Sequence, residues 1–130
     1  MEKHLQTSQS SSEATQVAYI AGLFDGEGSI DHTRRWERKQ KDKKKYFCLR
    51  ISCEIGMTDY EVLRWLHETL GYGTFKPRKV DTKNFPTAKP QWRWRCSFRD
   101  SYKFAKQMLP HAKVKYKKLK QIIDHYNEGT

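Results

Sequence analysis

An apolar stretch that runs directly into two carboxylates constrains the fold of this chain more than any other segment. Residues 17–30 read Val-Ala-Tyr-Ile-Ala-Gly-Leu-Phe-Asp-Gly-Glu-Gly-Ser-Ile, and Asp25 and Glu27 lie where the predicted helix ends. A helical face without bulky side chains lets a second helix approach closely. The pattern therefore predicts a helix–helix interface with acids at its end, which suggests a metal site built across two helices. Small residues recur at every fourth position of this face, namely Ala18, Gly22 and Gly26.

Length and charge narrow the class of protein. The chain has 130 residues, which suits one domain, and we expect residues 15–128 to form it after a disordered lead-in over residues 1–14. A net charge of +11, from 26 basic and 15 acidic residues, favours a polyanionic partner. No apolar run approaches the roughly 18 residues that span a bilayer, so we expect no membrane segment.

The three cysteines, Cys48, Cys53 and Cys96, form no Cys-x-x-Cys pair. Their odd number argues against a disulfide framework, and their spacing argues against a structural zinc site. We expect buried thiols in a reducing compartment, and therefore an intracellular protein, either cytoplasmic or organellar.

Periodicity and turn residues predict a mixed α+β chain. Thr58-Asp59 opens the second helix and Gly71 ends it, while Pro77 restricts the third strand to a sheet edge. Pro110 separates the last two helices. The predicted elements are a helix over 16–26, a strand from 29 to about 36, a charged loop over 37–45, a strand over 47–55, a helix to 70, a strand over 73–80, a loop over 81–90, a strand over 91–99, and helices over 100–109 and 112–127.

Two of these strands alternate cleanly between apolar and polar residues. In 47–55 the apolar face is Phe47, Leu49, Ile51, Cys53 and Ile55. In 91–99 we expect Trp92, Trp94, Cys96 and Phe98 to face the core and Arg93, Arg95, Ser97 and Arg99 to face solvent. Residues 76–99 hold eight basic residues and one acid. A cationic sheet face favours nucleic acid, and aromatics on the opposite face favour duplex DNA over single-stranded RNA.

The stretch Ile20-Ala21-Gly22-Leu23-Phe24-Asp25-Gly26-Glu27-Gly28-Ser29 resembles the signature of the LAGLIDADG homing endonucleases. An acidic residue is kept at both acidic positions. The predicted order of elements matches this family from residue 16 to about 127. The resemblance implies an αββαββαα fold with a curved, antiparallel, four-stranded DNA-binding sheet. Because the chain has one copy of the motif, it further implies a homodimer whose signature helices pack about a two-fold axis through Ala18, Gly22 and Gly26.

The resemblance also implies a metal site at the two-fold axis. Glu27 would present its carboxylate to Mg²⁺, or to another divalent cation, with backbone carbonyls near Gly26 as further oxygen ligands. Asp25 would act as a structural acid at the helix end. Lys115 would help to activate or orient solvent, with Lys113 as the second choice. The family often places a polar residue where this chain has Met57.

The polar strand residues match positions that family members use to read the major groove. They are Thr33, Arg35, Arg50, Ser52, Glu54, Lys76, Arg78, Arg93 and Arg95. We therefore predict a homodimeric, Mg²⁺-dependent, site-specific endonuclease without a small-molecule cofactor. It would cut a long, partly palindromic duplex by metal-assisted phosphodiester hydrolysis. The alternatives are a relative that binds nucleic acid without cutting it, such as an intron maturase or a transcriptional regulator, and a protein-binding module with a dimerisation helix.

Overall fold

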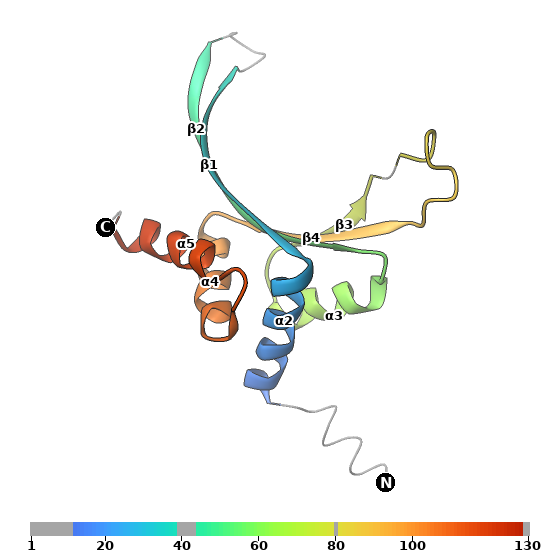
Figure 1. Cartoon of the computed structure of the whole chain (residues 1–130), viewed down its shortest axis with the longest axis horizontal. Helices are drawn as coiled ribbons and strands as arrows, with labels where there is room; N and C mark the ends of the chain where they lie inside the picture. The colour runs from blue at the N-terminus through green and yellow to red at the C-terminus, as the bar shows by residue number, and fades with distance from the viewer. Residues whose placement is uncertain (1–11, 39–43, 80, 129–130) are drawn as a thin grey trace.

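A computed structural model describes residues 12–38, 44–79 and 81–128 of the chain. In this part, four antiparallel strands form a sheet in the order β1-β2-β4-β3, and the helices lie against one face of it (Figure 1). The fold is thus the predicted mixed α+β arrangement with a four-stranded antiparallel sheet. The elements are α2 (Glu13–Glu27), β1 (Gly28–Arg38), β2 (Lys45–Met57), α3 (Tyr60–Leu70), β3 (Thr74–Arg78), β4 (Gln91–Ser97), α4 (Arg99–Met108), the 3-10 turn η1 (Leu109–His111) and α5 (Tyr116–Glu128).

Helix α2 begins earlier than the sequence pattern predicts. The Ser12 hydroxyl accepts a hydrogen bond from the backbone N–H of Thr15, which caps the helix so that Glu13 is its first residue. Ser12 and the two residues after it are therefore ordered, although we expected them in the lead-in. Residues 1–11 of that lead-in lie outside the described residues.

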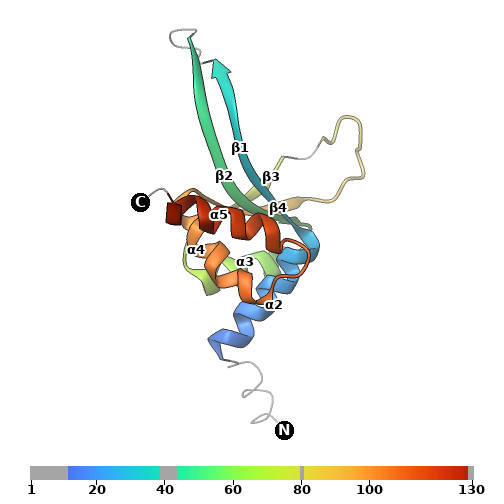
Figure 2. The same ribbon diagram turned by 60° about the vertical axis from the view of Figure 1, so that its left-hand side comes forward.

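The first two strands form a long hairpin that extends beyond the helices (Figure 2). Pairing continues as far as Arg38 opposite Lys45, so both ends of the predicted charged loop belong to strands. Residues 39–43 of that loop are outside the described residues. Beyond the helices, Trp36 and Phe47 pair across the strands on the apolar face, with ring centroids 5.4 Å apart. Phe47 is 57% exposed there, so it is not a core residue.

The predictions for the second helix and the edge strand are confirmed. The carboxylate of Asp59 accepts from the backbone N–H of Val62, and Gly71 ends α3 in the left-handed conformation at φ 78°. Strand β3 lies at the edge of the sheet, where Pro77 interrupts no central ladder.

The prediction that Phe98 faces the core is also wrong. Strand β4 ends at Ser97, and Phe98 turns the chain into α4 with a positive φ of 51° and 46% of its surface exposed. Its backbone N–H still donates to the Ile51 carbonyl at 2.8 Å. The alternation of the strand therefore stops one residue before Phe98, and its side chain leaves the core side.

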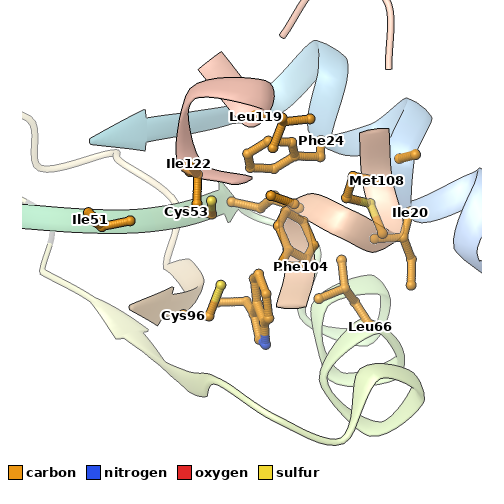
Figure 3. Packing of buried hydrophobic residues seen from close by; sticks show 14 of the residues in the cluster. Ile20, Phe24, Ile51, Cys53, Leu66, Cys96, Phe104, Met108, Leu119 and Ile122 are labelled. Carbon is orange, nitrogen blue, oxygen red and sulfur yellow. The ribbon is translucent and has the colours of Figure 1, made fainter. Parts of the chain in front are cut away.

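The core lies between the helices and the apolar face of the sheet (Figure 3). Phe24 of α2 meets Phe104 of α4 edge to face, with ring centroids 4.9 Å apart. Buried Trp94 donates its indole N–H to the Tyr72 carbonyl at 3.1 Å, so its polar atom is satisfied. Cys53 and Cys96 are buried free thiols as predicted, whereas Cys48 is only partly buried. No helix in the described ranges is long and apolar enough to cross a membrane.

Candidate nucleic-acid interface and the carboxylate end of helix α2

The pairing register places all nine predicted DNA contacts on the same side of the sheet. Residues directly opposite each other in an antiparallel pair share a face. Thr33 pairs with Arg50, and Glu54 pairs with Arg95. Because Ile51, Cys53 and Ile55 point into the core, these alternate residues point away from the helices. We call this side the polar face; it carries Ser29, Asp31, Thr33, Arg35, Glu37, Arg50, Ser52, Glu54, Lys76, Arg78, Arg93, Arg95 and Ser97.

Two glutamates organise the arginines of the polar face. Glu37 accepts from Arg50 through Nε at 3.0 Å and Nη2 at 2.6 Å, and from Arg35 through Nε at 3.1 Å. The hydrogen bond from Arg50, followed by that from Arg35, lowers the pKa of Glu37 to about 2. The sequence pattern did not identify Glu37 as a residue of this face, because it predicts a loop over 37–45. The alternation from Thr33 to Arg35 continues to Glu37 and would have identified it.

The second glutamate forms a similar cluster nearer the centre of the sheet. Glu54 accepts from Arg95 through Nε at 2.9 Å and Nη2 at 2.6 Å, and Arg93 Nε lies 3.6 Å from the same carboxylate. Arg78 of β3 reaches across β4 to β2, where a Cβ on Gly56 would lie 2.8 Å from its guanidinium. Glycine at this position therefore lets the Arg78 side chain lie close over the strand.

A polar hollow of about 210 Å³ lies between the two clusters. Arg50 and Arg95 line it from neighbouring strands, and Asp31 accepts a hydrogen bond there from the Thr33 hydroxyl at 2.8 Å. The remaining lining residues are Arg35, Ile51, Ser52, Ser97 and Phe98. The polar face is thus cationic overall, with both of its glutamates ion-paired, and its shape can admit the edge of a polar ligand.

At the carboxyl end of α2, Asp25 binds the segment that leads into α5. Its carboxylate accepts backbone N–H hydrogen bonds from Lys113 at 2.8 Å, Val114 at 3.0 Å and Lys115 at 3.1 Å. Burial would raise the pKa of Asp25, but these three bonds and the nearby lysine charge outweigh burial and lower it. Helix α5 begins at Tyr116 rather than near residue 112, because the backbone is extended at Ala112, and the N–H groups of the segment between them donate to Asp25.

The same contact places Lys115 beside the end of α2. Lys115 Nζ donates to the backbone carbonyl of Asp25 at 2.7 Å and lies 5.7 Å from the centre of the Phe24 ring. Lys113, the second choice, meets Asp25 through its backbone N–H only, within the described residues. The tertiary structure therefore places the Lys115 side chain against Asp25, two residues before Glu27. In the sequence, 88 positions separate Lys115 from Glu27.

Glu27 differs from Asp25 in having no partner. Its side chain is exposed, and no hydrogen bond or ion pair engages its carboxylate within residues 12–38, 44–79 and 81–128. The next residue, Gly28, lets the chain turn at once into β1, because a Cβ there would lie 2.2 Å from the Phe24 ring. Met57, at the end of β2, packs against the core and presents no polar group.

The face of α2 that carries Ala18, Gly22 and Gly26, which we call the small-residue face, is left largely uncovered by the described residues, with Ala18 partly buried. Gly22 and Gly26 are exposed, and a Cβ added at either would meet nothing within 4 Å. The opposite face of α2 buries Ile20, Ala21 and Phe24. One side of the helix thus belongs to the core, and the other is free to receive a second helix.

The donor atoms at the end of α2 suit a hard cation only in part. The exposed Glu27 carboxylate and backbone carbonyls near Gly26 are oxygen ligands of the kind that Mg²⁺ prefers. Within the described residues, no three acidic, histidine or cysteine side chains gather into a metal site. The described residues of one chain therefore offer only part of a ligand set for such a cation.

Comparison with solved structures identifies the fold of the chain. No protein-family model matches the chain, and no curated protein sequence matches it significantly. Solved structures do match, and they are LAGLIDADG homing endonucleases, so the fold expected from the signature stretch is confirmed. Each of these matches covers most of this chain.

Three of these structures illustrate the likeness. The homing endonuclease I-CvuI, in complex with its target, is 18% identical with a TM-score of 0.67; the match covers 86% of this chain and 66% of that one. The archaeal intron-encoded I-Vdi141I, complexed with DNA, is 19% identical with a TM-score of 0.65, and the match covers 89% and 69%. I-TnaI is 18% identical with a TM-score of 0.56, and the match covers 87% and 74%. The chain thus spans about two thirds of the length of the first of these proteins.

Proposed function

We propose that this protein is a homodimeric, Mg²⁺-dependent, site-specific double-strand DNA endonuclease. The observation that carries the proposal is the unpartnered Glu27 carboxylate at the end of a small-residue face, directly beside the polar face of the sheet. Similar folds in I-CvuI and I-Vdi141I were solved with DNA, which supports the same ligand class here.

DNA binding is assigned to the polar face. Its arginines and lysines would contact phosphates and base edges along the major groove, while its hydroxyls supply neutral hydrogen-bonding groups. The formal charge of +11 favours the same partner. Because the small-residue face admits a close second helix, two copies would extend the surface over a long, partly palindromic site.

The metal site is assigned to Glu27 and the backbone near Gly26 of both copies. A bound Mg²⁺ would activate water and stabilise the leaving oxygen of the phosphodiester. Asp25 holds the end of α2 against the segment before α5, and Lys115 adds a positive charge there that would orient solvent and substrate. Pairs of carboxylates at a two-fold axis repel each other, and a protein that only binds DNA gains nothing from them.

The test uses a plasmid that carries the uninterrupted insertion site of the host gene, incubated with the purified protein in Mg²⁺ or in EDTA. We expect linearisation in Mg²⁺, none in EDTA, and none with Glu27→Gln in either. Glu61→Gln, which removes an exposed acid on α3, is the matched control and should cut like the unmodified protein.

Two results would contradict the proposal in different places. Cleavage by Glu27→Gln at the rate of the unmodified protein would remove the metal assignment. Tight, salt-sensitive binding without cleavage of any candidate site would favour the non-cleaving alternative, a maturase or regulator that keeps the fold.

A further inference from the structure

Two arginines on the polar face are held by glutamates through the same edge of the guanidinium, Arg50 on both oxygens of Glu37 and Arg95 on Oε1 of Glu54. Arg50 directs Nε and Nη2 at Glu37, and Arg95 directs Nε and Nη2 at Glu54. Both ion pairs therefore use the side-on edge of the guanidinium. The first pair joins β1 to β2 and the second joins β2 to β4, so the arrangement occurs in two different parts of the sheet.

A side-on pair leaves the outer edge of the guanidinium available. A guanidinium has five N–H donors, and Nη1 together with the second proton of Nη2 forms a fork directed away from the glutamate. No hydrogen bond within the described part of the chain uses Nη1 of either arginine. The arginine side chains are 47% and 43% exposed, whereas Glu37 and Glu54 are 26% and 18% exposed. The glutamates thus lie deeper and the forks face outward.

The ligand that fits such a fork on duplex DNA is guanine. In the major groove, guanine presents N7 and O6 as two adjacent acceptors, and a bidentate arginine is their commonest specific partner. An arginine already fixed at its other edge loses less side-chain entropy when it binds. A carboxylate on this face would repel phosphates; both glutamates are neutralised by guanidiniums, whereas Asp31 accepts a hydrogen bond from the Thr33 hydroxyl.

We propose that Arg50 and Arg95 each read one guanine in the half-site bound by one subunit, and that Glu37 and Glu54 are positioning residues that aim them. This inference rests on the proposed function, because it names the bases that the polar face would select. Arg35 and Arg93 are the second arginines of the two clusters. They leave each cluster with more positive than negative charge.

The register gives the spacing of the two guanines. Arg95 lies opposite Glu54, which is four residues from Arg50 along β2. At about 3.3 Å per residue the two arginines are separated by about 13 Å along the strand. Arg50 extends toward Glu37, opposite Tyr46, and so away from Arg95; with a duplex rise of about 3.4 Å per base pair, the guanines should lie at least about four base pairs apart.

The experiment selects bound duplexes from a randomised library with the full-length protein in EDTA, so that cleavage does not deplete the pool. The unmodified protein should enrich guanine at two positions at least about four base pairs apart in each half-site. Arg50→Lys and Arg95→Lys keep the charge but lose the fork. Each should lose the guanine preference at one position, by about tenfold or more, and leave the other position unchanged.

The glutamate variants separate positioning from simple charge. Glu37→Gln should lose the preference at the position that Arg50→Lys affects, while its affinity for random-sequence duplex stays equal or rises. Glu54→Gln should do the same at the Arg95 position. Arg64→Lys and Glu61→Gln, which alter a similar ion pair on α3, are matched controls and should change no position.

Several results would overturn the inference. Guanine preference that persists in both Arg50→Lys and Arg95→Lys would remove the base contacts. Loss of a cytosine preference in Glu54→Gln, with guanine unchanged, would make Glu54 a reader rather than a positioning residue. Failure of the unmodified protein to retain any duplex at low salt would instead contradict the proposed DNA-binding function itself.

Discussion

On the polar face of the sheet, Glu37 and Glu54 each lie between two arginines, whereas at the end of α2 the Glu27 carboxylate has no partner among the described residues. Asp25, two residues before it, is engaged by three backbone N–H groups. Four acids in one small domain thus occupy three electrostatic settings.

This difference in the pairing of carboxylates indicates that the two regions suit different ligands. A surface that meets phosphates needs its acids neutralised, because unpaired carboxylates would repel DNA. A site that holds a divalent cation needs a carboxylate that nothing else neutralises. Under the proposed function, the ion-paired Glu37 and Glu54 would suit the binding face, and Glu27, which has no partner among the described residues, would suit the metal site.

The largest expected effect comes from removing the carboxylate of Glu27, compared with removing the ion-paired carboxylate of Glu54. Glu27→Gln should lower the cleavage rate by about 10³-fold, since it removes an oxygen ligand that carries charge to the metal. Glu54→Gln should leave the rate at saturating DNA near its original value. Single-turnover cleavage of a fixed target measures both, and equal losses in the two variants would erase the distinction between the regions.

The next effect concerns the small-residue face. Gly22→Leu fills open space in the single chain, and it should raise monomer stability by about 0.5–1 kcal/mol through helix propensity. It should weaken the dimer by about 10- to 100-fold, because the second helix can no longer approach. Sedimentation analysis over a concentration series measures this effect. Glu68→Leu on α3 is the control, and an unchanged dimer in Gly22→Leu would place the interface elsewhere.

Asp25→Asn tests the structural acid. At pH 7 it should reduce the free energy of unfolding by about 1–3 kcal/mol, because an amide accepts these backbone bonds less well. The folded pKa of Asp25 is lowered below its ordinary value of 3.8, so this stabilisation is complete above about pH 4 and is lost as the pH falls further. Urea unfolding at pH 7 and pH 3 should show the difference shrinking. Asp124→Asn, in an exposed pair with Lys120, should cost little at either pH.

The smallest expected effect is the contribution of one arginine to salt dependence. Arg78→Gln should reduce the slope of log affinity against log salt by about one, if its guanidinium neutralises one phosphate. Arg64→Gln on α3 should leave the slope unchanged. Titration of labelled duplex at several salt concentrations distinguishes the two, and equal slopes in both variants would place Arg78 outside the contact surface.

Local patterns predicted most elements well, and the failures have physical reasons. Asp59 and Gly71 bound α3 as expected, because capping depends on neighbouring residues only. Phe98 left the core because the chain must turn into α4 there, which alternation alone does not reveal. Glu37 was missed because continued pairing with Tyr46 extends the strand into charged sequence.

The sequence by itself determined the small-residue face, the two acids at the end of α2 and the separation of polar from apolar strand faces, since these depend on helical and strand periodicity. Only the tertiary structure decided which acids are paired. The Asp25 contact spans 88 to 90 positions, and the Arg95–Glu54 pair spans 41. Such contacts depend on how distant segments pack. The signature resemblance implied different roles for Asp25 and Glu27, but only the tertiary structure gave the three backbone partners of Asp25.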